Sequence, residues 1–414
     1  MTDTQHRNPF YAVSGLIVSM GLLAFGNGLM FAFVPLRLAE LGRDPSAAGW
    51  MLTAMAAGGF LGCVITGPLT RYVGHARAFM TLAAMTVLTY AALATFEGMF
   101  AWATARMGYG LAVTGLFIVA QTWLNNATPN ELRGRVVSVF NMFYVLNIGA
   151  GGFTIGLLPL DATSAPVLAI VLVALSIISA GVTSLPVPER SPPSPVSLRI
   201  VWQAAPVALA GALAVGGLTS LVQGYAPIYA QSQGYSAQQV GQLLLLMQLG
   251  MLVVQTPLGA LSDRIDRRVV IVIACVLVLL AAGIARLWTG MPFWILVPIF
   301  GLWAGATETI FSVSNAHGND RVSPENALTL TSTLMFAWSV SGFVFPGIAA
   351  ALTASLGETA FMGVAMGIAC ALAAFIALRL LTREKVDDQT KNQHSTRTGQ
   401  APYMNELLSK SHRR

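Results

Sequence analysis

Charge is the property that this sequence has least of. Only 10% of its 414 residues are Asp, Glu, Lys or Arg, whereas 55% are hydrophobic. A soluble protein carries about 25% charged residues, so this chain has too few charges to coat a surface that faces water. The strict polar and apolar alternation of strands is also missing, which argues against a transmembrane β-barrel. The composition therefore predicts a helical membrane protein.

Cysteine and histidine are scarce as well. The three cysteines, Cys63, Cys275 and Cys370, lie far apart in apolar segments, which predicts small core residues and no disulfide. The five histidines show no metal-ligand spacing. A phosphate-binding Gly-x-x-x-x-Gly-Lys loop is absent, so ATP is not expected to drive this chain. We therefore expect no metal, no cofactor and no enzymatic activity.

Long apolar segments dominate the chain instead. A segment of about 20 residues is long enough to cross about 30 Å of hydrocarbon as an α-helix, and a helix pairs its own backbone polar groups in lipid. We predict twelve such helices, at residues 10–38, 46–70, 78–96, 99–124, 136–160, 164–186, 199–231, 236–261, 269–288, 292–317, 327–353 and 356–381.

A proline-rich stretch divides these helices into two sets of six. Five prolines fall between Pro186 and Pro195, which indicates an extended connector. We therefore predict a first six-helix bundle over 1–186, a cytoplasmic linker over 187–198 and a second bundle over 199–381. The polar residues 382–414 lack periodicity and are expected to form a disordered cytoplasmic tail.

The basic residues gather on one side of the predicted helices. With an internal N-terminus, all but four of the 23 Lys and Arg fall in cytoplasmic segments; the exceptions are Arg37, Arg43, Arg106 and Arg286. This is the positive-inside pattern, and it predicts that both termini lie in the cytoplasm. Membrane topology thus accounts for the formal charge of +6, and we expect no nucleic-acid partner.

Proline and glycine recur at a fixed offset of 192 residues. The matched pairs are Pro35 and Pro227, Gly42 and Gly234, Gly49 and Gly241, Gly58 and Gly250, and Gly67 and Gly259. Each set lies at a hydrophobic helix followed by a second hydrophobic helix, and a short basic loop sits at the end of the second helix. A membrane chain built of two such halves is typical of a secondary transporter.

Two motifs resemble those of the major facilitator superfamily. The loop Gly259-x-Leu-x-Asp263-Arg264-x-x-Arg267-Arg268 resembles its signature loop, and Arg106 with Gly110 resembles its second motif, although Tyr109 stands where Gln is usual. The resemblance covers nearly the whole chain. It implies two six-helix bundles that rock about a central cavity.

Several short segments are similar to the bacterial YcaD-like branch of that superfamily. They are Tyr225-Ala-Pro-Ile-Tyr-Ala, Ser262 to Arg268, Ala316 to Arg321, and Trp123-Leu-Asn-Asn with Arg133-Gly-Arg135. This resemblance implies a bacterial inner (plasma) membrane. Two positions depart from the pattern: Arg71 replaces the acid of the first-half loop, and Gln121 stands where Glu is expected.

Ionisable side chains inside a membrane cost about 3 kcal/mol on insertion scales and are functional candidates by default. Glu308 is the only acid placed near the middle of a predicted helix, on one stripe with Ser312 and Asn315. It is the proton-coupling candidate, and its alternative role is a structural hydrogen bond. Arg106 is the matching base, as a counter-ion, a clamp for a solute carboxylate, or a structural pin.

Neutral polar residues complete the expected cavity. The superfamily resemblance gives a lining role to the first, fourth, seventh and tenth helices. The candidates for contact with the solute are Asn27, Arg106, Gln121, Gln223, Tyr225, Gln248, Asn315 and Trp338. Interhelical hydrogen bonding is the alternative role of each amide.

The two basic loops are expected to gate transport. The predicted gating residues are Gly67, Arg71, Gly259, Asp263, Arg264, Arg267 and Arg268. By resemblance, Asp263 docks against the N-terminus of the fifth helix near Arg133, where an acid is stabilised by about 0.3–1 kcal/mol. Simple topology-setting charge is the alternative role.

Taken together, these features predict a monomeric secondary active transporter of a small solute in the lipid bilayer, working by alternating access. Proton coupling is the preferred mechanism, and export is one direction that it allows. Two alternatives stay open at this point. One is a facilitator without ion coupling, and the other is a receptor or scaffold that keeps a transporter fold.

Overall fold

The computed structural model describes residues 9–128, 130–181 and 196–382. Most of the predicted linker and all but one residue of the predicted tail lie outside these ranges. The described residues form α-helices and two short 3-10 helices, with no strand among them. In the first half these are α1 (Pro9–Glu40), α2 (Pro45–Val73), α3 (His75–Thr95), α4 (Met99–Ala127), α5 (Asn130–Thr154), η1 (Ile155–Leu157) and α6 (Ser164–Gly181).

The second half repeats this order after one short helix. Its elements are α7 (Leu198–Ala204), α8 (Pro206–Ser232), α9 (Ala237–Arg264), α10 (Arg267–Leu287), α11 (Phe293–Asn319), η2 (Pro324–Asn326), α12 (Ala327–Leu356) and α13 (Ala360–Thr382). Twelve helices of the described chain are long and apolar enough to cross a membrane, which confirms the predicted number. The fold is therefore an all-α membrane fold.

The helix predicted at 199–231 is not continuous, so this prediction was wrong. The structure divides it into α7 and α8 at Ala205, whose backbone leaves the helical region at φ −140° and ψ 61°. The cause is Pro206, because a proline ring disfavours the α conformation in the residue before it. Pro206 itself fits the first position of α8, where its missing N–H removes no hydrogen bond.

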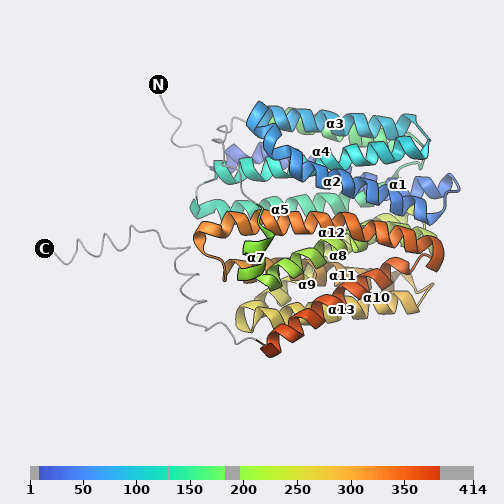
Figure 1. Ribbon diagram of the computed structural model, residues 1–414. Helices are drawn as coiled ribbons and strands as arrows, with labels where there is room; N and C mark the ends of the chain where they lie inside the picture. Colours follow the sequence, from blue (N-terminus) through green and yellow to red (C-terminus); the bar gives the residue numbers. More distant parts are fainter. Residues whose placement is uncertain (1–8, 129, 182–195, 383–414) are drawn as a thin grey trace, which may run out of the picture.

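The helices form two bundles that lie side by side (Figure 1). In that view α1 to α6 occupy the upper half and α8 to α13 the lower half. Helix α2 packs on α4 and α1 on α5 in the first bundle, and α9 packs on α11 and α8 on α12 in the second. The bundles meet along two seams, α2 against α12 and α5 against α9. We call the side where α1 begins and α13 ends the base, at the left of Figure 1, and the opposite side the far side.

The fixed sequence offset corresponds to a repeated turn on the far side. Gly42 after α1 and Gly234 after α8 both have positive φ angles, of 67° and 81°. In each turn the residue after the glycine donates from its backbone N–H to a carbonyl five residues earlier, at 3.0 Å for Arg43 and 3.1 Å for Tyr235. This is the Schellman geometry, which favours glycine because other side chains resist that φ.

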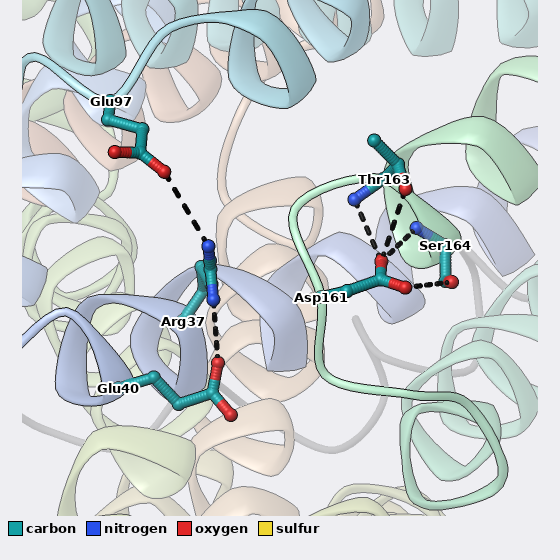
Figure 2. Close-up of polar contacts among 6 residues, drawn as sticks. All are labelled: Arg37, Glu40, Glu97, Asp161, Thr163 and Ser164. Carbon is teal, nitrogen blue, oxygen red and sulfur yellow. Dashed lines mark hydrogen bonds and ion pairs between the residues drawn. The ribbon is translucent and has the colours of Figure 1, made fainter.

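Polar contacts also fix the far-side loops (Figure 2). The Arg37 guanidinium lies 2.9 Å from Glu40 and 3.6 Å from Glu97. Asp161 accepts hydrogen bonds from the backbone N–H groups of Ser164 and Thr163, at 2.6 and 2.9 Å, just before α6. The Ser164 backbone bond, followed by the Ser164 hydroxyl and Thr163, lowers the pKa of Asp161 to about 2.

Candidate functional site

The two bundles touch closely on the far side. The Tyr225 hydroxyl of α8 donates to the Pro346 carbonyl of α12 at 3.0 Å, and the Tyr225 side chain is only 2% exposed. A Cβ at Gly49 of α2 would lie 2.7 Å from the same hydroxyl oxygen and 3.0 Å from the Ala350 Cβ. Tyr225, predicted to contact solute, is thus packed into the joint between the bundles in this structure.

The second seam closes at the same level. A Cβ at Gly152 of α5 would lie 2.9 Å from the Leu244 Cβ of α9, and one at Gly241 would lie 2.9 Å from the Gly152 carbonyl oxygen. Only glycine permits such an approach of the two backbones. Gln248, a predicted lining residue of α9, is also buried here, beside Gly149.

Arg106 of α4 lies in the far half of the first bundle and is 3% exposed. One terminal nitrogen donates to the Met55 sulfur at 2.9 Å, and the guanidinium lies 5.1 Å from the Tyr109 ring centre and 5.7 Å from that of Phe31. Its Nε and its other terminal nitrogen have no hydrogen-bond partner. Among the described residues it forms no ion pair, so its role as a counter-ion to Glu308 finds no support here.

A small pocket opens beside this guanidinium. Both bundles contribute to its wall, and every other lining side chain is apolar. The lining residues are Phe31, Val34, Pro35, Ala48, Met51, Leu52, Arg106, Gly224 and Ile228. An uncompensated charge therefore faces an apolar pocket at the joint between the bundles, which is an energetically costly arrangement unless an anion occupies it.

Asn27 and Tyr109 form a hydrogen bond between α1 and α4. The Tyr109 hydroxyl donates to the Asn27 side-chain oxygen, and the Tyr109 ring stacks on Tyr90 with the ring centres 5.4 Å apart. All three side chains are buried. In this structure Asn27 therefore has the role that was the alternative in the sequence analysis, an interhelical hydrogen bond.

Glu308 of α11 lies near the middle of the second bundle and is partly buried. It forms no ion pair among the described residues. The Thr219 hydroxyl of α8 approaches its carboxyl without reaching a well-formed hydrogen bond. Of the other two stripe residues, Ser312 donates from its hydroxyl to the Thr309 carbonyl, and the backbone carbonyl of Asn315 accepts from the Asn319 side chain.

Four polar side chains on α11, the helix of Glu308, and on the adjacent helix α8 were not predicted from the sequence. Their buried polar atoms lack a hydrogen-bond partner; they belong to Thr219 of α8 and to Trp303, Thr307 and Ser314 of α11. A polar group left unpaired in a protein interior costs about 1–3 kcal/mol, and such groups mark a place for water or a polar solute. A serine, threonine or tryptophan in an apolar helix does not by itself predict such a site, because the groups that surround it in space come from another helix.

Three predicted lining residues remain. Gln121 of α4, Gln223 of α8 and Trp338 of α12 are partly buried. A Cβ at Gly216 would collide with the Trp338 carbonyl oxygen, so α12 and α8 meet closely at this tryptophan. No hydrogen bond among the described residues links Gln121 or Gln223 to Arg106 or Glu308.

The predicted gating loops lie at the base. Arg71, Asp263 and Arg264 are exposed, and a Cβ at Gly67 or Gly259 would meet nothing within 4 Å. Asp263 forms no ion pair within the described residues, and the side chain of its expected partner Arg133 lies outside them. Docking of Asp263 on α5 therefore stays a prediction.

Asp266, which the sequence analysis did not single out, forms the ion pair of this loop. It accepts from the Arg268 backbone N–H at 2.9 Å and from the Arg268 guanidinium at 2.8 Å, and so caps α10. Burial raises the pKa of Asp266, but the hydrogen bonds and charge of Arg268 outweigh it and hold that pKa below its ordinary value. Arg267 pairs instead with Asp320 at 3.1 Å. An Asp directly before an apolar helix is the cap signal that could have identified Asp266.

The sequence is similar to those of known membrane transporters. Residues 16–244 and 207–411 match the Major Facilitator Superfamily (MFS). A protein of Enterobacter sp. (strain 638), named as an uncharacterised MFS-type transporter, is 23% identical over 388 residues, which cover 92% of this chain and 97% of that protein. The MFS-type transporter YcaD of Salmonella newport (strain SL254) is 21% identical over 375 residues, covering 89% and 94%.

Two solved structures share the fold. A crystal structure of the nucleoside transporter NupG, in a mutant form, superposes with a TM-score of 0.72 at 12% identity, covering 90% of this chain and all of that one. The human organic anion transporter MFSD10 superposes with a TM-score of 0.63 at 17% identity and the same coverage. Both are similar in fold, at identities too low to indicate a shared solute.

Proposed function

This chain belongs to the major facilitator superfamily, in its YcaD-like branch, and we propose that it is a proton-coupled secondary transporter of a small solute that carries an acidic group. It is a transporter and not an enzyme. One observation carries the proposal. Arg106 and Glu308, of opposite charge, are placed in opposite bundles, and neither has an ion-pair partner among the described residues.

Arg106 supports the acidic character of the solute. A guanidinium stays protonated in proteins, so it cannot escape its burial by losing a proton. Two of its nitrogens, Nε and Nη1, have no hydrogen-bond partner, and each can donate to an oxygen of a carboxylate or phosphate. An anionic solute would supply the charge that the protein lacks at this point.

Glu308 supports proton coupling. A carboxyl group in a membrane interior can be neutralised by taking up a proton, and it becomes costly when ionised without a partner. Binding and release on opposite sides would move one proton per cycle. One charge moving across 100 mV is worth about 2.3 kcal/mol, which sustains a gradient of about fifty-fold.

The closed far side supports alternating access. Both seams between the bundles are tight on that side, at Gly49 and at Gly152. We propose that the far side opens when the seams separate, while the loops of Asp263 and Arg71 close the base. The bundles would turn as two bodies, joined by the stretch before α7.

The proposed orientation follows from the basic residues. All but four of them fall in sequence segments that are predicted to be cytoplasmic, and these segments include the loops at the base, so the base would face the cytoplasm of the bacterial inner membrane. Reporter fusions at Met1 and Arg414 test this orientation. An external location of either end would contradict it.

The decisive test of the mechanism is Glu308→Gln, which keeps the shape of the side chain and fixes it as neutral. A thermal-shift screen against metabolites, sugars and drugs first identifies a bound solute, because binding raises stability by mass action. In proteoliposomes with an imposed pH gradient, the variant should then lose uphill accumulation and keep solute exchange. If the variant accumulates as much solute as the wild type, Glu308 does not carry the coupled proton.

The uncoupled facilitator remains the second candidate, because Gln121 supplies an amide where related chains are expected to have a carboxylate. Under that candidate, the wild type moves solute without any response to the pH gradient. The same proteoliposome assay therefore separates the two functions.

A further inference from the structure

The pocket beside Arg106 is small enough to select its occupant. It offers about 10 Å³, which is about the room that a single water molecule needs. Helices α1 and α2 of the first bundle and α8 of the second bundle close it around the guanidinium, through Phe31, Met51 and Ile228 among others. While the far side is closed, this pocket therefore admits one water molecule or one monatomic ion, and an organic solute enters only after the bundles separate.

The charge of Arg106 favours an anion in that space. The side chain is 3% exposed, and a guanidinium keeps its proton in proteins. One terminal nitrogen donates to the Met55 sulfur at 2.9 Å, a weak acceptor, while Nε and Nη1 have no hydrogen-bond partner. The faces of the Tyr109 and Phe31 rings attract the cation but carry no negative charge. A buried charge of this kind is costly until an anion compensates it.

The acidic side chains of the adjoining far-side segments are engaged elsewhere. Glu40 and Glu97 both pair with Arg37, at 2.9 and 3.6 Å. Asp44 accepts from the backbone N–H of Ser46 at 2.8 Å, at the start of α2. None of these three acids lines the pocket. Within the described chain, compensation of the guanidinium in the pocket is therefore left to a bound anion.

The wall of the pocket favours a halide ion over water. Apart from Arg106 it offers no acidic, amide or hydroxyl side chain. A buried water molecule typically makes about three hydrogen bonds, and its own hydrogens need acceptors. A halide ion has no hydrogens and needs only donors, and the guanidinium supplies a charged one.

We propose that this pocket binds one chloride ion while the far side is closed and no solute is bound. An N–H group of Arg106 that lacks a protein acceptor donates to the ion, whose charge compensates that of the guanidinium. The acidic group of the solute replaces the chloride ion when the bundles separate, so the two anions compete. This inference rests on the anion-binding role of Arg106 in the proposed function, and it names a second ligand of that residue.

Thermal denaturation of the purified full chain tests the site before any solute is known. The probes are sodium chloride and sodium bromide, compared with sodium methanesulfonate at the same concentration, because methanesulfonate is too large for the pocket. Both halides should raise the thermal midpoint of the wild type by about 2 °C or more over methanesulfonate, since a ligand that binds the folded state stabilises it.

Arg106→Met should lose this halide response, because it removes both the charge and the donor. Arg286→Met is the matched control. Arg286 also lies on the far side, but it donates to the Thr359 carbonyl at 3.4 Å and does not line the pocket, so its variant should keep the wild-type response. If Arg106→Met does not fold, Ala48→Val gives the comparison: it fills the pocket and keeps Arg106, and should likewise lose the response.

Two results would overturn the chloride site. Equal midpoints of the wild type in halide and methanesulfonate would mean that the pocket holds water only, and a halide response that persists in Arg106→Met would place the ion elsewhere. The proposed function has a separate readout, the stabilisation of the wild type by an acidic solute in chloride-free buffer. If that stabilisation occurs without a halide response, the solute class stands and the chloride site fails. If a halide response depends on Arg106 and no acidic solute binds, the chloride site stands and the solute class fails.

Discussion

The Arg106 guanidinium donates to the Met55 sulfur at 2.9 Å, between α4 and α2, and forms no ion pair with any described carboxylate. A thioether is a weak acceptor and leaves the charge uncompensated. The apolar wall of the adjacent pocket offers no acidic, amide or hydroxyl side chain. A buried charge without a counter-charge is costly, which is why we propose that Arg106 meets the acidic group of the solute.

Arg106→Met should therefore stabilise the solute-free protein. Replacing buried charge by an apolar side chain of similar volume is often stabilising, by about 1–4 kcal/mol. We expect a higher thermal midpoint in the absence of solute, together with loss of stabilisation by acidic solutes. Thermal denaturation of the purified variant measures both.

Arg286→Met is the control for that experiment. Arg286 lies in the last turn of α10 on the far side and donates to the Thr359 carbonyl at 3.4 Å, so its loss should lower the midpoint or leave it unchanged. A lower midpoint for Arg106→Met would show instead that Arg106 is a structural pin.

The gating loops predict an asymmetry between two residues at equivalent positions. Arg71 and Asp263 are 192 residues apart, both exposed at the base. Asp263→Asn should impair transport strongly, because the acid can cap the N-terminus of α5 when the base closes. Arg71→Ala should have the milder effect, because an arginine lacks that capping chemistry. Initial transport rates at matched expression compare them, and equal losses would contradict the prediction.

The seam between α2 and α12 predicts a cross-link. The Cys63 sulfur lies 3.1 Å from the Ser339 hydroxyl oxygen, so Ser339→Cys would bring two sulfur atoms within reach of a disulfide. Oxidation should join the bundles and stop transport, and reduction should restore it. After proteolysis between the bundles, the two fragments should stay together on a non-reducing gel.

Ser341→Cys is the control for the cross-link. Ser341 lies on the same helix, and its hydroxyl donates to the Trp338 carbonyl in α12 instead of reaching α2. Its cysteine variant should not join the fragments. A disulfide in both variants, or in neither, would argue against this packing of α2 on α12.

The sequence determined the membrane architecture. Hydrophobic length is a local property, so α1, α4 and α13 could be placed within a few residues of their ends, and twelve spans could be counted. The offset of 192 residues likewise predicted that Gly42 and Gly234 play the same role, because a turn with positive φ selects glycine locally.

Candidate polar residues could also be identified, because an ionisable group is conspicuous in an apolar helix. Arg106 and Glu308 are the clearest cases. Their partners could not be predicted, since a partner lies on another helix at a depth that sequence spacing does not specify. Arg106 proved to meet Met55, and Glu308 to approach Thr219.

Only the tertiary structure decided which polar groups are satisfied and which are exposed to a pocket. Asn27 is bonded to Tyr109, and Asp266 engages Arg268 while Asp263 stays exposed, although the two acids are three residues apart. At the base of the second bundle, one small pocket is lined by residues as far apart in sequence as Pro206 and Arg379. Hydropathy fixes where each helix crosses the membrane, whereas the rotation and contact of helices depend on side-chain packing between distant segments.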